Sequence, residues 1–317
     1  MAAQSVGASS PKRRRLGKLA RIEEREFYLF ISPWIIGLIL FDFGPIIASL
    51  LASFTDWPIL EGPKWAGLQN YATMLNDPLF FKALLNSLYY GFFTVGFGLI
   101  ISFMLALLLN QKVFGMAFFR TVFYLPSVVS GIAVAILWLM ILHPDFGLIN
   151  TILGAVGIKG PGWLTSPLWS KPALILMSLW AAGGSMVIYL AGLQSVPLHL
   201  YEAAEIDGAG AWHKFWQITV PMMTPVIFYN IMIGIIASLQ NFVIVLVMTS
   251  GLSSQPGGPA NSTLMYGLYL YLNAFRFFKM GYASALAWVL LVIIILITIA
   301  QFQLARRWVF YEGDTRR

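Results

Sequence analysis

The stretch that decides the fold is residues 202–221, EAAEIDGAGAWHKFWQITVP. It contains three acids, a His, a Lys and two glycines, yet apolar residues flank it on both sides. MVIYLAGLQSVPLHLY ends just before it, at residue 201, and MMTPVIFYNIMIGIIASL begins just after it, at residue 222. Because both flanks are apolar enough to lie in a membrane, we expect the stretch to be a polar loop that leaves the bilayer and contacts something outside it.

The composition of the whole chain supports a membrane protein. Of its 317 residues, 59% are hydrophobic and 10% are charged, whereas a soluble domain has about 25% charged residues. Long continuous apolar runs, rather than alternating ten-residue segments, exclude a β-barrel and predict an all-α polytopic membrane protein. Each run exceeds the roughly 20 residues that cross a bilayer as a helix. The six expected spans are residues 29–54, 84–109, 121–142, 172–194, 222–249 and 282–305.

Lys and Arg residues predict the orientation of these spans. If the N-terminus is cytoplasmic, the inside segments are residues 1–28, 110–120, 195–221 and 306–317, which hold fourteen of the twenty Lys and Arg residues. Both termini are therefore expected in the cytoplasm. Residues 1–28 are interpreted as a basic tail with an amphipathic lead-in that lies on anionic lipid, and not as a nucleic-acid site. Residues 29–305 form the six-span domain, and residues 306–317 form a second cytoplasmic tail.

The chain lacks the residues and motifs that several kinds of enzyme and metal site require. The chain has no cysteine and no GxxxxGK[ST], HExxH or GxSxG motif, which argues against an ATPase, a metal site or a membrane-embedded enzyme. The expected spans contain no Lys or Arg and one carboxylate, Asp42. A self-powered secondary transporter usually carries more charge within the membrane, so energy for transport would come from another protein. Asp42 is either a relay for protons or solute or a structural carboxylate. In the second case it is buried against other helices, or it lies near the outer surface if the helix is broken at Gly44–Pro45.

The polar loop itself reads as two short helices. Residues Leu200–Ile206 form the first, and the DGAG sequence at 207–210 breaks it, because glycine adopts positive φ easily. The second covers about Ala211–Ile218, and Pro221 begins the next span, where a missing N–H costs nothing. The second helix presents Trp212, Phe215 and Trp216. Such aromatic side chains suit a knob that docks into a groove of another protein, although a loop lying on lipid headgroups would have a similar composition.

Polar residues within the spans are candidates for a solute pathway. Ser238 and Asn241 are three residues apart and are expected to share one helical face, with Gly234 on the same stripe leaving room for a bulky group. The preceding span offers Trp180 and the sequence GGSM at 183–186, whose glycines permit either close helix packing or a local break. Amides, hydroxyls and aromatic rings together suit a sugar, but these residue types alone do not exclude other solutes.

The spacing within the loop resembles a known family. Glu202-Ala203-Ala204, Gly208, Ile218, Val220 and Pro221 look like the EAA loop of importer-type ABC transporter permeases, with Val220 where Leu is usual. Other stretches, including FRTVFYLPSVVSGIAVAILWLMI and QNFVIVLVMTSG, look like permeases of carbohydrate importers. The resemblance covers about residues 28–308. It is strongest to the first of the two permeases in glycerol-phosphate, maltose and multiple-sugar systems.

This resemblance implies a type I importer permease that takes a sugar or oligosaccharide from an extracytoplasmic solute-binding protein. Its expected partners are a second, homologous permease in a heterodimer and an ABC ATPase dimer in a bacterial or archaeal cytoplasmic membrane. The chain itself would bind no cofactor, because ATP and magnesium would be used by the ATPase. A phosphorylated polyol is the alternative solute, but it would favour a cationic residue in the pathway, and the expected spans have none.

The residues implied to contact the ATPase are Glu202, Ala203, Ala204, Asp207, Gly208, Trp212, Phe215, Ile218 and Pro221. The residues implied to line the solute pathway are Ser238 and Asn241, followed by Trp180, Ser185 and Gly234.

Overall fold

The computed structural model describes residues 18–59, 61–111, 113–250 and 256–310. The expectations for the basic tail before residue 18 and for the C-terminal tail after residue 310 lie outside the described residues. The chain divides into two compact units, Met1–Leu51 and Ala52–Arg317, and each is described by itself.

The first unit is one long apolar helix interrupted by a wide turn. Helix α1 (Lys18–Gly37) passes into a π-helical segment, Leu38–Phe43, and then into α2 (Gly44–Ser53). The N–H of Gly44 bonds to the carbonyl of Ile39, five residues earlier, which is the hydrogen-bond pattern of a π-helix. Asp42 lies within this π-helical segment, where no residue is buried within the described chain.

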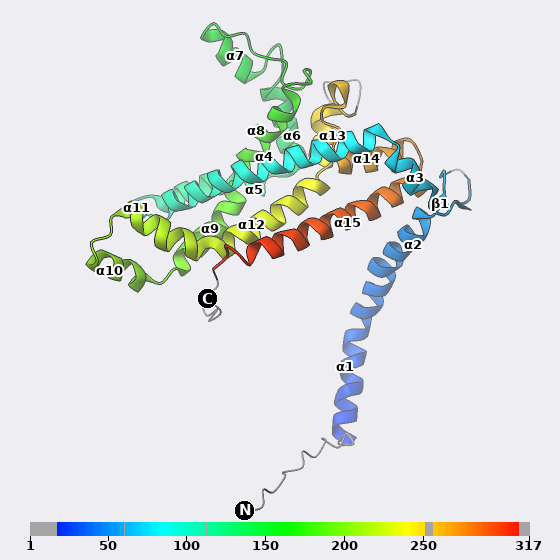
Figure 1. Cartoon of the computed structure of the whole chain (residues 1–317), viewed down its shortest axis with the longest axis horizontal. Helices are drawn as coiled ribbons and strands as arrows, with labels where there is room; N and C mark the ends of the chain where they lie inside the picture. The colour runs from blue at the N-terminus through cyan, green and yellow to red at the C-terminus, as the bar shows by residue number, and fades with distance from the viewer. Residues whose placement is uncertain (1–17, 60, 112, 251–255, 311–317) are drawn as a thin grey trace, which may run out of the picture. The chain divides into compact units, whose positions relative to one another are not determined.

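The second unit is built around three long helices that run side by side (Figure 1). They are α4 (Pro78–Leu109), α12 (Val220–Gln240) and α15 (Met280–Ala305). Helix α4 begins sharply because the Asp77 side chain accepts a hydrogen bond of 2.9 Å from the N–H of Leu79 and Pro78 occupies the first helical position.

Two further segments are bent pairs of helices. Helices α5 (Met116–Val128) and α6 (Gly131–Ile141) meet at 96°, and α8 (Ser170–Trp180) and α9 (Gly183–Ser195) meet at 48°. Within the described residues, four helices are long and apolar enough to cross a membrane, and the number rises to six if each bent pair is one span. The expected segments 121–142 and 172–194 are therefore apolar as predicted but are not continuous helices.

The expected segment 222–249 is also broken. Helix α12 ends at Gln240, Asn241 has an extended conformation with φ −70° and ψ 117°, and α13 (Val243–Ser250) follows. The expectation that Ser238 and Asn241 share one helical face is therefore wrong, because Asn241 is outside the helix. The break leaves backbone groups without helical partners, which is tolerated at membrane depth only where protein or a cavity surrounds them.

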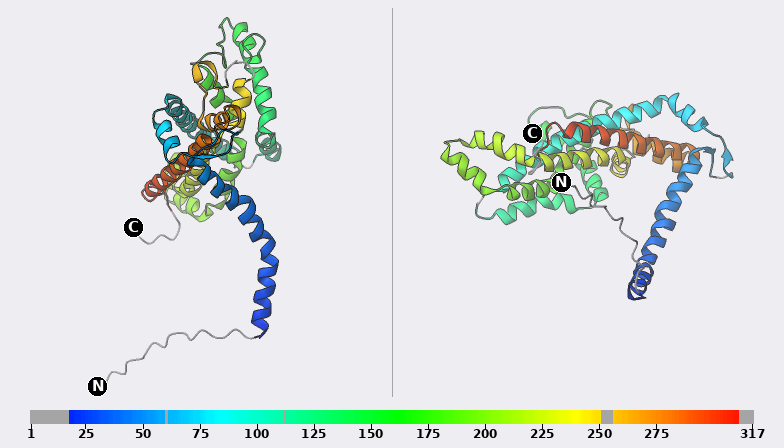
Figure 2. Two further views of the ribbon diagram at one scale, coloured as in Figure 1. Left: turned by 90° about the vertical axis from the view of Figure 1, so that its right-hand side faces the viewer. Right: turned by 60° about the horizontal axis from the view of Figure 1, so that its bottom comes forward.

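Short elements gather at the two ends of the long helices. One end carries β1 (Thr55–Asp56), paired antiparallel with β2 (Lys64–Trp65), and α3 (Gln69–Leu75). The opposite end carries α10 (Leu198–Ile206) and α11 (Ala211–Lys214), followed by the π-helical turn Phe215–Thr219 (Figures 1 and 2). The remaining short helices are α7 (Leu148–Ala155), the 3₁₀ turn Pro259–Asn261, and α14 (Tyr266–Tyr271), which continues into a π-helical turn at Leu272–Arg276.

Three buried clusters hold the second unit together, of which the smallest joins Phe228, Ala305 and Val309. The largest one includes Tyr266, whose hydroxyl donates to the carbonyl of Leu286 at 2.8 Å and whose N–H donates to Ser87 Oγ at 2.7 Å. The second one joins Phe103, Tyr189 and neighbouring residues of α4, α9 and α12. Because lipid is as apolar as these side chains, close packing and internal hydrogen bonds, more than the hydrophobic effect, favour this arrangement.

Candidate functional site

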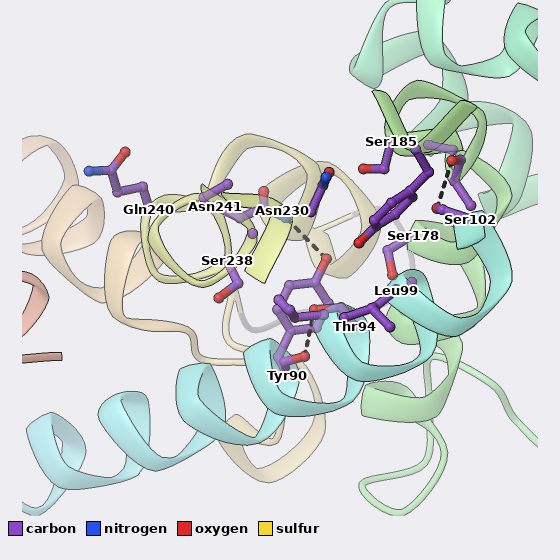
Figure 3. Close-up of a pocket in the computed structure, with 17 residues that line it drawn as sticks. Tyr90, Thr94, Leu99, Ser102, Ser178, Ser185, Asn230, Ser238, Gln240 and Asn241 are labelled. Atoms are coloured by element: carbon purple, nitrogen blue, oxygen red, sulfur yellow. Dashed lines mark hydrogen bonds between the residues drawn. The ribbon is translucent and has the colours of Figure 1, made fainter. Parts of the chain in front are cut away.

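A polar cavity of about 550 Å³ lies between α4, α8, α9 and α12 (Figure 3). Its size falls within the range of about 300–1,000 Å³ that is usual for pockets that bind small molecules. Figure 3 shows Tyr90 and Thr94 on α4, with Ser178 and Ser185 on the neighbouring helices α8 and α9. The polar side chains that line the cavity are Tyr90, Thr94, Ser102, Ser178, Ser185, Tyr189, Asn230, Ser238, Gln240 and Asn241.

The two helix breaks create this polar lining. Asn241, released from α12, donates from its side-chain amide to the hydroxyl of Tyr90 at 3.2 Å. At the break between α8 and α9, the hydroxyl of Ser102 donates to the carbonyl of Ala182 at 2.8 Å, and this carbonyl also accepts the N–H of Met186 at 3.1 Å. The bend also brings α9 so close to α5 that a side chain at Gly183 would overlap the carbonyl of Phe123. Close packing and a local break, the two interpretations of the adjacent glycines, therefore occur together.

Tyr189 adds a hydroxyl that has no partner. Its side chain is fully buried and lines the cavity, and within the described residues no hydrogen-bond partner of its hydroxyl oxygen is found. A buried polar group without a partner usually costs about 1–3 kcal/mol, so its position at a cavity indicates a group that a ligand or water satisfies.

Four of the five residues expected in the solute pathway line this cavity: Ser238, Asn241, Ser185 and Gly234. A Cβ at Gly234 would lie 3.1 Å from Val95, so this glycine permits close approach of α4 instead of leaving open room. The fifth residue, Trp180, lies outside the lining, is 41% exposed and packs edge to face on Trp138 at 6.3 Å.

Helix α4 supplies lining residues that the sequence analysis missed. Tyr90, Thr94, Gly98 and Ser102 all line the cavity, and they recur every fourth residue. Small and polar residues at this spacing lie along one side of a helix, so the pattern was a usable signal within an otherwise apolar span.

The loop between α9 and α12 forms the predicted helix–turn–helix. Gly208 has φ +77°, the N–H of Ala209 bonds to the carbonyl of Ala204 at 2.8 Å, and the N–H of Gly208 bonds to the carbonyl of Glu205 at 3.0 Å. These bonds and the left-handed glycine are the Schellman motif that ends helices. The second helix differs from the expectation, because α11 ends at Lys214 and a π-helical turn leads directly into α12.

An ion pair spans the turn. Lys214 Nζ lies 2.7 Å from Glu205 Oε1, and this hydrogen bond and the charge of Lys214 hold the pKa of Glu205 below its usual range. Tyr201 and Thr219 are joined by a hydroxyl contact of 2.9 Å on the side nearer the long helices. Glu202 is exposed and forms no ion pair with another described residue.

The tip of the loop exposes apolar side chains beside a hollow of about 400 Å³. Ile206 is 87% exposed and Trp212 is 74% exposed, so both side chains project from the loop. Asp207 and Gly208 line the hollow, together with Ala204. Of the other residues expected to contact an ATPase, Ala203 is exposed, whereas Phe215, Ile218 and Pro221 are partly buried.

A chain of aromatic rings joins this tip to the cavity. The centroid of Trp212 lies 6.0 Å from that of Phe215, which lies 6.2 Å from that of Phe103. Phe103 in turn packs edge to face on Tyr189 at 5.6 Å. The loop and the cavity lining are therefore connected by direct side-chain packing.

A separate polar cluster lies at the end of the bundle opposite the loop. The carboxylate of Asp77 accepts hydrogen bonds from the hydroxyls of Tyr269 and Tyr282, the latter at 2.9 Å. Burial, together with the hydrogen bond to Asp77, raises the pKa of Tyr269 to about 12. Because Asp77 also caps α4, this cluster fixes the start of α4 against α14 and α15.

Comparison with known proteins identifies the kind of molecule. Residues 98–309 match the family model described as binding-protein-dependent transport system inner membrane component. The probable ABC transporter permease protein YesP of Bacillus subtilis is 42% identical over 90% of this chain and 92% of its own length. The lactose transport system permease protein LacF of Rhizobium radiobacter is 36% identical over 91% of this chain and 96% of its own. A bacterial alginate ABC transporter, solved in complex with an alginate pentasaccharide-bound periplasmic protein, contains a chain with TM-score 0.78 and 25% identity that covers 92% of this chain and 98% of that one.

Proposed function

The chain belongs to the family of binding-protein-dependent transport system inner membrane components, and from this premise we propose that it is a permease subunit of an ATP-driven carbohydrate importer. Six spans would cross the cytoplasmic membrane, with each bent helix pair counting as one span and both termini inside. This topology puts the loop of α10 and α11 in the cytoplasm and the end with β1, β2 and α3 outside.

The observation that carries the proposal is the polar cavity joined by packed rings to an exposed loop. Hydroxyls and amides from α4, α9 and α12 would bind the hydroxyl groups of a sugar, and the rings of Tyr90 and Tyr189 would pack against its apolar face. The unpartnered hydroxyl of Tyr189 would gain a hydrogen bond when solute enters.

The exposed loop would couple transport to ATP hydrolysis. Trp212 and Ile206 would insert into a groove of the ATPase, and Glu202 would pair with a basic residue there. ATP and magnesium would bind to the ATPase dimer. Because Phe215 packs on Phe103, movement of the loop would shift α4 and α9 and open the cavity toward one side of the membrane at a time.

Two further partners complete the proposed importer. A permease of this kind would pair with a second, homologous permease, so that the cavity lies near their interface, and it would receive its solute from an extracytoplasmic binding protein at the outer end. LacF belongs to a lactose transport system and the alginate transporter carries a polysaccharide, which supports a carbohydrate as the solute.

Purification in native detergent tests the partners. The intact chain should bring down an ATPase and a second permease, identified by mass spectrometry, and Trp212→Ala should lose the ATPase while keeping the second permease. Trp65→Ala is a matched control, because Trp65 has the same 74% exposure as Trp212 but lies at the opposite end of the bundle. Recovery of the chain alone, or equal ATPase recovery with both variants, would contradict the proposal.

A further inference from the structure

Two lysines lie within the helices that enclose the cavity. Helix α4 begins at Pro78 and α8 begins at Ser170, each earlier than the expected span, so Lys82 and Lys171 are helical residues. The expected spans contain no cation because they begin two residues after Lys82 and one residue after Lys171. The exclusion of an anionic solute depended on those boundaries.

The two ammonium groups are held by one small network of polar contacts. Lys171 Nζ donates to Asn86 Oδ1 at 3.1 Å and lies 4.8 Å from the centroid of the Tyr89 ring. Lys82 Nζ donates to the carbonyl of Ala260 at 2.6 Å. The amide nitrogen of Asn86 donates to the carbonyls of Asn261, at 3.0 Å, and Leu264, at 3.1 Å. These bonds fix Asn86 with its oxygen toward Lys171, so Lys82 contacts the segment around Ala260 directly and Lys171 is linked to it through Asn86.

The partners of these lysines are all neutral. Within the described residues, the ion pairs are Glu61 with Lys64 and Glu205 with Lys214, and neither Lys82 nor Lys171 has a carboxylate within 4.0 Å. Lys171 is partly buried, where a positive charge is less well screened than at an open surface. The protein therefore leaves two positive charges uncompensated at one place.

With the proposed orientation, this place lies beyond the cavity lining, toward the outer ends of α4 and α8. On α4, Asn86 comes one turn before Tyr90, which lines the cavity beside Thr94 (Figure 3). On α8, Lys171 comes two turns before Ser178, which also lines the cavity. Since α4 starts at the end of the bundle away from α10 and α11 (Figure 1), a solute that enters from outside would pass the lysines first.

We propose that Lys82 and Lys171 form a cationic entrance that selects carbohydrates bearing carboxylate groups, such as uronate oligosaccharides. This inference rests on the proposed function and adds the charge of the solute to it. The hydroxyls and amides of the cavity would bind the neutral parts of the sugar, while the ammonium groups attract its carboxylates. Headgroup phosphates of lipids share this anionic chemistry, so the test must separate the two sources.

The test of the cationic entrance measures equilibrium binding of two probes to the complete transporter. The transporter is reconstituted in nanodiscs of phosphatidylcholine without the binding protein. The probes are trigalacturonate and its carboxyl-reduced counterpart, which differ only in charge and the carboxyl oxygen. We expect the acidic probe to bind about tenfold more tightly, as one charge-assisted hydrogen bond would give, and the preference to shrink at high salt. The double variant Lys82→Gln and Lys171→Gln should remove the preference, because glutamine still donates a hydrogen bond but carries no charge.

Lys159→Gln is the matched control, since it removes a charge from an exposed lysine of the outer loop after α7. The preference should survive in this variant. Equal binding of the two probes, or a preference that persists in the double variant, would overturn the cationic entrance while leaving the carbohydrate function in place. Failure of both probes to bind would count against both proposals. Loss of the preference when phosphatidylglycerol is added would assign the lysines to lipid headgroups and would also overturn the inference.

Discussion

Gly208 offers the sharpest test of coupling through the loop. It has φ +77° at the turn between α10 and α11, and a Cβ built on it meets no atom within 4 Å. A substitution such as Gly208→Val therefore strains the backbone without creating a clash within the chain. Two of the turn's hydrogen bonds, from Gly208 to Glu205 and from Ala209 to Ala204, depend on this left-handed conformation.

The strain sets the size of the expected effect. A residue with a Cβ in the left-handed region costs about 1–2 kcal/mol, and a β-branched residue is the least tolerant. A change of this size shifts a two-state equilibrium by a factor of about 5–30. We therefore expect the turn to open in a large fraction of molecules, while the helices of the second unit keep their packing.

The assay measures solute transported per ATP hydrolysed by the reconstituted transporter. Gly208→Val should lower this ratio by about fivefold or more, with normal insertion and normal recovery of the second permease. Gly210→Ser controls for added bulk in the same loop, because Gly210 has φ −69° and also has no atom within 4 Å. Gly115→Val controls for strain alone, because Gly115 has φ +77° and open space but precedes α5.

Two outcomes would refute this reasoning. An unchanged ratio in Gly208→Val would mean that the left-handed turn is not needed for coupling. An equal loss in Gly115→Val would mean that strain at any such turn impairs the protein, and the effect at Gly208 would then say nothing of coupling.

Three other substitutions test the cavity and the packing around it. Tyr189→Phe should weaken solute binding by about 0.5–1.5 kcal/mol and leave thermal stability unchanged, because its hydroxyl has no partner in the described residues; a lower melting temperature would show that the hydroxyl is structural. Gly183→Ala should destabilise the protein by about 1–3 kcal/mol in thermal unfolding, because the new methyl group overlaps the carbonyl of Phe123. Gly184→Ala is the control and should be tolerated, because its methyl group lies 3.4 Å from Ser127. Similar losses of stability in both variants would reject a specific contact at Gly183. Asp77→Asn should cost about 1.5–3 kcal/mol of stability, because it removes the charge that accepts hydroxyl hydrogen bonds but keeps a cap for α4; an unchanged melting temperature would mean that these bonds contribute little.

The sequence predicted the loop of α10 and α11 well because its signals are local. Gly208 ends a helix through its own backbone freedom, and the polar composition of residues 202–221 separates two apolar segments whatever packs around them. The ion pair between Lys214 and Glu205 could not be predicted in this way, because it depends on the turn angle, which spacing alone does not give.

The helix breaks could not be predicted in the same way. Residues 222–249 read as one apolar run, yet the chain leaves the helix at Asn241, where its amide reaches Tyr90 from α4. Residues 172–194 bend where the hydroxyl of Ser102, 80 positions earlier in the chain, donates to the carbonyl of Ala182. At each break, a side chain that is distant in the sequence adds a hydrogen bond that spacing alone does not reveal.

The amino-acid sequence by itself determined that the chain crosses a membrane, where its polar loop lies and which family the loop resembles. These properties depend on hydrophobicity, charge and glycine content, which act over a few neighbouring residues. Only the tertiary structure decided that Tyr189 faces the cavity, that Trp180 does not, and that Lys171 bonds to Asn86 while Lys82 bonds to Ala260. Such placement depends on contacts between residues far apart in the chain, because the direction of a side chain in a membrane helix is set by the helices packed against it.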